Sequence, residues 1–82
     1  SDGFKVKYGR NSLTYSEGRK YLIVPIEHLG TPYEMAVYLN MPGEWMEKGI
    51  AVGKPSETDL DIVEQKIRDS LIFLQRNFSI SR

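Results

Sequence analysis

The sequence predicts an α+β fold, an antiparallel meander sheet of four to five strands with one long C-terminal helix packed on one face. Three features predict it. Apolar and polar residues alternate along much of the first 40 positions, turn residues separate the alternating segments, and one apolar stripe at helical spacing follows position 56. With 82 residues, the chain is expected to form a single domain, residues 1–82.

The first expected element is an N-terminal β-hairpin. Apolar and basic side chains alternate along Phe4–Tyr8 (FKVKY), the period expected when one face of a strand is buried and the other is wet. Gly9–Asn11 supplies turn residues, and Leu13 and Tyr15 then resume the alternation.

Two further strands are expected. Segment 19–26 (RKYLIVPI), after a turn at Ser16–Gly18, is apolar on both faces and predicts a central strand. Pro25 is expected near its end, because proline would remove a ladder hydrogen bond from the middle. After a loop at Gly30–Pro32, the segment Tyr33–Asn40 (YEMAVYLN) alternates again and predicts a fourth strand.

The long helix is expected to begin after Ser56, whose side chain can cap the first backbone N–H groups. Its apolar residues recur at spacings of 3, 4, 4, 3 and 4 and form one stripe over about five turns: Leu60, Val63, Ile67, Leu71, Leu74 and Phe78. We expect this stripe to pack on the sheet. Within the glycine-rich segment Met46–Pro55, Gly49–Gly53 has the composition of a short strand, as does Phe78–Ser81.

The composition argues against an enzyme, a metal centre and a cofactor. His28 is the one histidine and cysteine is absent, so the usual metal-ligand sets cannot form. A Glu27–His28 dyad is disfavoured, because adjacent strand residues point to opposite faces. Gly49–Ser56 has three residues between its glycines where a phosphate-binding loop needs four, and Pro55 stands where that loop needs Ser or Thr. We therefore expect no catalytic residue, metal ligand or cofactor.

A cytoplasmic protein is expected. The lack of cysteine suits a reducing compartment. The longest apolar run, Tyr21–Ile26, is far shorter than the roughly 20 residues of a membrane helix, so no membrane contact is expected.

The formal net charge of zero conceals a segregation along the chain. Residues 1–20 carry five basic and two acidic side chains, and residues 65–82 carry four basic and one acidic, so each segment has a net charge of +3. Residues 21–64 carry two basic and eight acidic side chains, a net charge of −6. Such asymmetry can steer a partner of opposite charge.

The acidic middle segment is the predicted partner-binding surface. From Tyr21 to Glu47 the chain has no lysine or arginine and interleaves carboxylates with aromatic residues. Aromatic anchors dominate interface energies, and acidic groups accelerate encounter with a basic partner. The predicted contact residues are Glu27, Tyr33, Glu34, Tyr38, Glu44, Trp45 and Glu47. A competing interpretation makes the glutamates ordinary hydrated surface and Trp45 a lid over the core.

The basic hairpin supplies the alternative function, a small nucleic-acid-binding module. Lys5 and Lys7 share one strand face, Arg10 lies at the turn, and Arg19 and Lys20 follow, so a positive ribbon would run along a nucleic acid backbone. No basic-aromatic reading motif accompanies these charges. Solvated surface is therefore the favoured interpretation, and nucleic acid is the less expected partner.

Several segments occur in an order that points to one class of protein. They are Leu13–Arg19 (LTYSEGR), Leu22–Val24 (LIV) with Glu27 and Leu29, Val37–Leu39 (VYL), Trp45, and a helix from Ser56 to Phe73–Gln75 (FLQ). In this order the chain, from about Phe4 onward, resembles the small immunity proteins of bacterial polymorphic toxin systems, including those of contact-dependent inhibition. The segment Met46–Pro55 departs most from the pattern.

The resemblance implies an inhibitor that has no chemistry of its own. An immunity protein binds a toxin domain delivered by sibling cells and neutralises it by covering its active site or a nearby surface. Toxins of this class are often nucleases with basic substrate clefts. The implied partner is therefore a basic toxin domain, met by the glutamates as charge complement and by Tyr33, Tyr38 and Trp45 as anchors.

Overall fold

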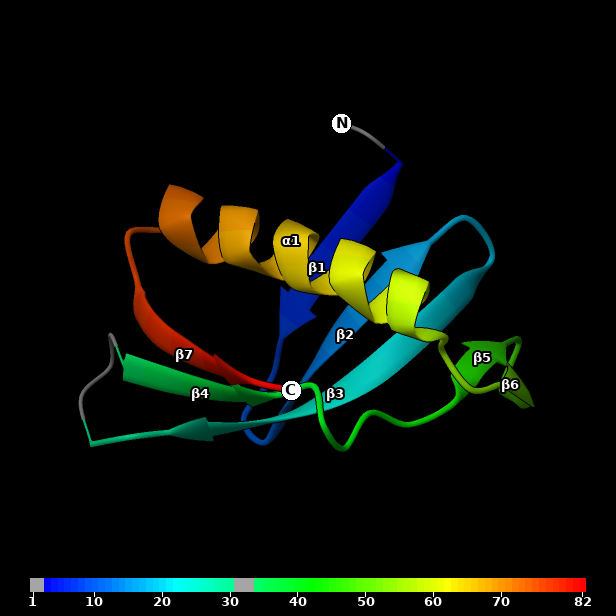
Figure 1. Ribbon diagram of the computed structural model, residues 1–82, viewed down its shortest axis with the longest axis horizontal. Coiled ribbons are helices and arrows are strands. Elements are labelled where there is room, and N and C mark those ends of the chain that lie inside the picture. The colour runs from blue at the N-terminus through cyan, green and yellow to red at the C-terminus, as the bar shows by residue number, and fades with distance from the viewer. Residues whose placement is uncertain (1–2, 31–33) are drawn as a thin grey trace.

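A computed structural model describes residues 3–30 and 34–82. These residues form seven strands and one helix (Figure 1): β1 (Phe4–Tyr8), β2 (Ser12–Glu17), β3 (Lys20–His28), β4 (Glu34–Tyr38), β5 (Trp45–Glu47), β6 (Ile50–Gly53), α1 (Glu57–Phe73) and β7 (Asn77–Ser81). Within this part of the chain, no helix has the length and apolar character needed to cross a bilayer.

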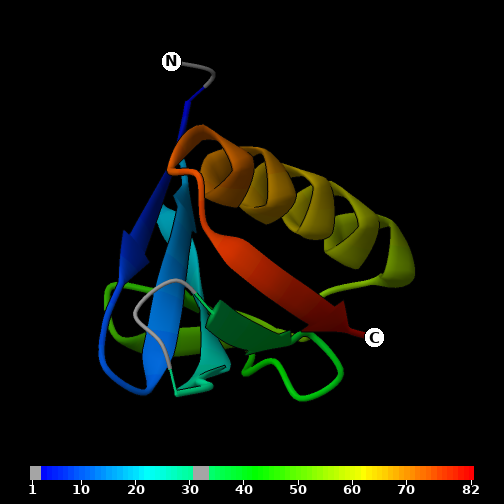
Figure 2. The same ribbon diagram turned by 90° about the vertical axis from the view of Figure 1, so that its left-hand side faces the viewer.

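The sheet has the order β1-β2-β3-β4-β7, and the helix covers one of its faces (Figures 1 and 2). The first four strands pair antiparallel with their neighbours, whereas β7 pairs parallel with β4. The predicted α+β class, with a mostly antiparallel sheet and one helix near the C-terminus, is confirmed. The predicted count of four to five strands is wrong, because the described residues form seven. The segments Gly49–Gly53 and Phe78–Ser81, which have the composition of short strands, contribute to β6 and β7, and β5 pairs with β3 and β6.

Strand β3 is the central strand of the sheet. One of its edges pairs with β2, and its other edge pairs with both β4 and β5. Its C-terminal half, Ile26–His28, pairs with β4, and Tyr21 near its start pairs with Met46 of β5. Between these contacts, the backbone N–H of Gly43 donates a 3.2 Å hydrogen bond to the carbonyl of Ile23. The loop between β4 and β5 therefore runs along the edge of β3.

The core lies between the sheet and the helix. Alternate residues of β2, β3 and β4 are buried there, and they meet three helix residues one to two turns apart. The buried cluster comprises Leu13, Tyr15, Leu22, Val24, Ile26, Met35, Val37, Leu39, Trp45, Val63, Ile67 and Leu71. The prediction that the helical stripe packs on the sheet is confirmed, because Val63, Ile67 and Leu71 lie in one cluster with buried strand residues.

The helix begins as predicted and ends sooner. Ser56 forms a capping box with Asp59, in which the Ser56 hydroxyl accepts from the Asp59 N–H and the Asp59 carboxylate accepts from the Ser56 N–H. The predicted stripe extends too far, because Leu74 is the exposed C-cap and Phe78 belongs to β7. Gln75, with a φ of 58°, turns the chain back toward the sheet.

The first hairpin is confirmed, with Tyr8 opposite Leu13. The second predicted turn is displaced, because Ser16 and Glu17 still belong to β2. Gly18, with a φ of 63°, allows the chain to reverse directly after Glu17.

Candidate partner-binding surface

One face of the sheet is left uncovered by the helix, and strand register fixes which side chains it carries. Lys5 of β1 is level with Ser16 and Tyr21, and Lys7 is level with Thr14 and Ile23. Farther along β3, Glu27 pairs with Ala36 of β4. We call this the helix-free face; its members include Lys5, Lys7, Thr14, Ser16, Tyr21, Ile23, Glu27, Ala36 and Tyr38.

Glu27 of β3 and Tyr38 of β4, both among the predicted contact residues, come together on this face. The Tyr38 hydroxyl donates a 2.8 Å hydrogen bond to Oε1 of Glu27. This bond favours the protonated phenol and raises the pKa of Tyr38. Among the described residues, no lysine or arginine forms an ion pair with Glu27. No lysine or arginine of the described residues therefore neutralises this exposed carboxylate.

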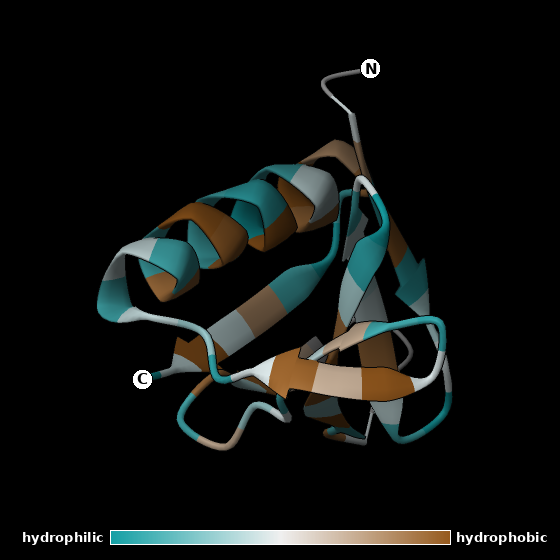
Figure 3. Cartoon of the chain, turned by 90° about the vertical axis from the view of Figure 1, so that its right-hand side faces the viewer, coloured by the Kyte–Doolittle hydropathy of each residue, from teal (hydrophilic) through white to brown (hydrophobic). Residues whose placement is uncertain are grey.

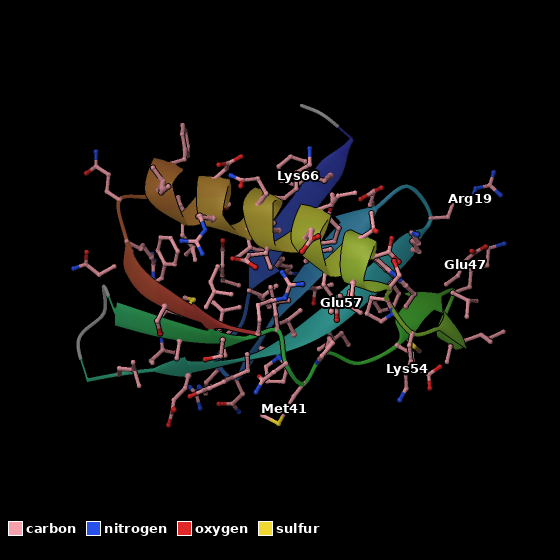
Figure 4. The ribbon with its side chains drawn as sticks, viewed as in Figure 1. Arg19, Met41, Glu47, Lys54, Glu57 and Lys66 are labelled. Atoms are coloured by element: carbon pink, nitrogen blue, oxygen red, sulfur yellow. The ribbon has the colours of Figure 1, made fainter. Side chains whose placement is uncertain are left out.

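The loop after β4 extends this surface toward β5. The Met41 N–H bonds to the Tyr38 carbonyl in a turn, and Gly43 is bonded to Ile23 of β3. Figure 4 shows Met41 on the side of the sheet away from α1. The side chain of Met41 is 59% exposed, that of Ile23 is 44% exposed, and Glu44 is also exposed. We define the β3–β4 surface as Ile23, Glu27, Tyr38, Met41 and Glu44.

Trp45 does not belong to an exposed surface. It is 6% exposed, its ring lies 6.1 Å from that of Tyr15, and the Lys20 ammonium sits 4.3 Å above it. Of the two roles expected for this residue, covering the core is the one that the structure shows. An indole covered in this way is not available as an anchor for a partner.

Glu47, another predicted contact residue, lies far from Glu27. It belongs to β5, beside the start of β3 at Tyr21, and Glu27 lies six positions after Tyr21, a distance of roughly 20 Å along the strand. Glu34 is the first residue of β4. Tyr33 lies outside the described residues. The predicted acidic surface is thus divided between the two ends of β3.

Sequence reasoning missed the apolar surface of β6. All four β6 residues are exposed, including Ile50 at 68% and Val52 at 53%. Figure 3 shows this apolar strand at one end of the molecule. The signal was present in the letters IAVG, but nothing in the sequence indicated that this short strand would lie at an edge without a covering layer.

The basic residues of the first hairpin also separate. Lys5 and Lys7 are exposed on the helix-free face, whereas Lys20 packs over the Trp45 ring. Arg10 follows β1 and Arg19 follows β2, so these two lie at opposite ends of a six-residue strand. No single positive ribbon results, and nothing in this geometry favours the nucleic-acid alternative.

A cluster of ion pairs links the helix to Arg82, the residue that follows β7. The Arg82 guanidinium contacts three helix carboxylates, those of Glu57 at 3.1 Å, Asp61 at 3.0 Å and Glu64 at 2.7 Å. These bonds raise the pKa of Arg82, and the bonds from Arg68 and Arg82 lower that of Glu64. The described residues contain no group of three His, Asp or Glu side chains arranged to hold a metal.

Comparison of the chain with protein-family models, curated proteins and solved structures yields no match.

Proposed function

We propose that the protein is a cytoplasmic immunity protein that binds a basic bacterial toxin domain, such as a nuclease, through its β3–β4 surface. The observation that carries the proposal is the Glu27–Tyr38 pair, a carboxyl group and an aromatic ring joined by a hydrogen bond on the sheet face that the helix leaves uncovered. Exposed Ile23 precedes Glu27 by four residues on the same face of β3, and exposed Met41 follows Tyr38 by three residues on the loop after β4. An apolar patch with carboxylates at its border suits a basic protein partner.

The pair is suited to recognition because it is already ordered. The 2.8 Å bond holds the ring and the carboxylate in one arrangement, so little side-chain freedom is lost when a partner binds. Oε1 of Glu27 accepts from Tyr38, and the charge of the carboxylate can still attract an arginine or lysine of the partner. Glu44, on the adjoining loop, adds a second negative charge to the same side.

The test is direct binding and protection. The protein is co-expressed with the C-terminal domain of the product of the upstream reading frame, and survival is expected only when both are present. With the purified pair, Glu27→Lys is expected to slow association at least tenfold, because attraction becomes repulsion. Asp69→Lys, an equal charge change on the exposed side of α1, serves as the matched control and should leave association nearly unchanged.

Salt dependence supplies a second criterion. The wild-type association rate should fall steeply between low and high ionic strength, and this slope should flatten in Glu27→Lys. An association rate that ignores both salt and Glu27→Lys would refute the β3–β4 surface as the binding site.

A further inference from the structure

The β5–β6 hairpin presents the most exposed apolar strand of the described chain. It projects from one end of the sheet (Figure 1), and β6 pairs with β5 alone. One edge of β6 therefore carries backbone groups without a strand partner, next to Ile50 and Val52. Exposed apolar side chains beside an open edge are the features of a site that accepts an added strand.

The other outer strands are protected in ways that β6 is not. Strand β1 carries Lys5 and Lys7, charges that discourage pairing with another strand. Strand β7 lies under helix side chains, with the Arg68 guanidinium 5.5 Å from the centre of the Phe78 ring and Arg82 bonded to the helix. Strand β6 has no charged residue between Ile50 and Gly53. Figure 3 shows its apolar length facing outward.

The turn of this hairpin places a positive charge where backbone geometry favours another residue. Glu47 pairs with Ile50, and the two residues between them, Lys48 and Gly49, have φ values of 54° and 81°. Such two-residue turns prefer asparagine followed by glycine, because a side chain like that of lysine is strained at positive φ. A lysine held there at a cost in stability suggests a function for its charge.

Lysines bracket the apolar strand on both sides. Lys48 precedes β6 and Lys54 follows it, both exposed, and Figure 4 shows Lys54 beside the hairpin. Glu47 is the one carboxylate between Trp45 and Lys54. A second copy paired antiparallel about Ala51 would place Lys48 opposite the Lys54 of that copy, and like charges directly opposite are destabilising. The charges therefore disfavour self-pairing.

We propose that the open edge of β6 binds an extended segment of another protein, apolar at its centre and acidic at both ends. The backbone of this segment would pair with Ile50–Val52, its apolar side chains would cover Ile50 and Val52, and its carboxylates would meet Lys48 and Lys54. This site lies at the end of β3 away from the Glu27–Tyr38 pair, and it does not depend on the toxin proposal.

The experiment uses the full chain and a labelled peptide of sequence Glu-Glu-Val-Thr-Val-Thr-Val-Glu-Glu, with binding followed by fluorescence polarisation. Two control peptides are used. In one, lysine replaces all four glutamates, and in the other, proline replaces the central valine. The acidic peptide should bind saturably, whereas the lysine and proline peptides should bind at least tenfold more weakly because of charge and lost backbone pairing.

Protein variants separate a recognition role from a structural one. Ile50→Ser should weaken acidic-peptide binding by about tenfold through lost apolar burial. Lys48→Asn should weaken it by about two- to fivefold while raising the melting temperature, because asparagine tolerates the turn. Lys5→Asn, on the distant strand β1, should change neither quantity.

Three results would overturn the proposal. One is the absence of saturable binding at millimolar acidic peptide, and another is equal binding of the acidic and lysine peptides. The third is a dimer of the free chain that dissociates in Ile50→Ser, which would identify a second copy as the occupant of β6.

Discussion

The indole Nε1 of Trp45 donates a 3.3 Å hydrogen bond to Oδ2 of Asp59, the same oxygen that accepts from the Ser56 N–H at 3.0 Å. One carboxylate oxygen therefore joins the start of β5 to the first turn of α1. The aromatic ring covers the core from the sheet side, and its polar atom fixes the beginning of the helix. Residues that the chain order separates by a glycine-rich segment are thus energetically coupled.

Replacing Trp45 should be strongly destabilising. Trp45→Ala is expected to reduce the free energy of unfolding by roughly 3–5 kcal/mol, because it leaves a large cavity beside Tyr15 and removes the bond to Asp59. Urea denaturation followed by circular dichroism measures the loss. Trp45→Phe should lose less, since it keeps most of the apolar volume. A loss below about 1 kcal/mol for the alanine variant would disagree with a core role.

The capping box provides a smaller and more local prediction. Ser56→Ala removes the acceptor of the Asp59 N–H, which lies 3.1 Å away, and should cost about 1 kcal/mol of stability. Thr58→Ala, two positions later on the exposed first turn, is the matched control and should cost no stability, because alanine has a higher helix propensity than threonine. Equal losses in both variants would argue against a specific capping role for Ser56.

Acid should destabilise the fold through two carboxylates with lowered pKa values. Backbone and side-chain bonds to Ser56 and the bond from Trp45 lower the pKa of Asp59, and bonds from Arg68 and Arg82 lower that of Glu64. Because both folded-state values lie below the unfolded ones, this contribution is fully present above about pH 5 and is lost as pH falls through the folded values. The urea midpoint should therefore drop between pH 5 and pH 2.5.

The double variant Asp59→Asn, Glu64→Gln should be less stable than wild type at pH 7 but should show a shallower pH dependence. If its midpoint falls with pH as steeply as that of the wild type, other carboxylates are responsible.

The Glu27–Tyr38 hydrogen bond predicts a titration effect at the proposed binding surface. Glu27→Gln removes the negative charge that favours the neutral phenol, so the pKa of Tyr38 should move down toward its ordinary value. The ring carbon attached to the hydroxyl, observed by NMR with 13C-labelled tyrosine, reports this titration. The other tyrosines serve as internal controls, and a Tyr38 titration that is the same in both proteins would argue against the hydrogen bond in solution.

The sequence predicted what repeats and missed what depends on distant pairing. Alternation along β1, β2 and β4, the apolar run in β3 and the stripe from Leu60 to Leu71 identified the sheet, the helix and most of the core. Periodicity carries no information on β5, a three-residue strand that depends on pairing with β3 and β6. It also assigned Phe78 both to the helical stripe and to a short strand, and the turn at Gln75 places this residue in the strand.

The sequence predicted which residues contact a partner, but it did not predict how these residues are arranged relative to one another. Glu27 and Tyr38 do share one surface, because β3 pairs with β4 there, whereas Glu44 lies on the loop that follows β4, next to the residue bonded to Ile23. Glu47 falls at the far end of β3, and Trp45 turns inward. The order of residues along the chain could not show which of these side chains would lie together, because the path of the loop at Gly43 depends on its hydrogen bond to Ile23 of β3.

The parallel pairing of β4 with β7 joins two strands that lie far apart in the sequence. Glu34 is level with Asn77, 43 positions later, so this pairing cannot form during synthesis until the helix between them has left the ribosome. Until then β4 is an edge strand of the nascent chain, and the backbone groups on its open edge have no strand partner. Translation that stalls within α1 would therefore release a product prone to aggregation, whereas in chains that include β7 this strand pairs with the open edge of β4.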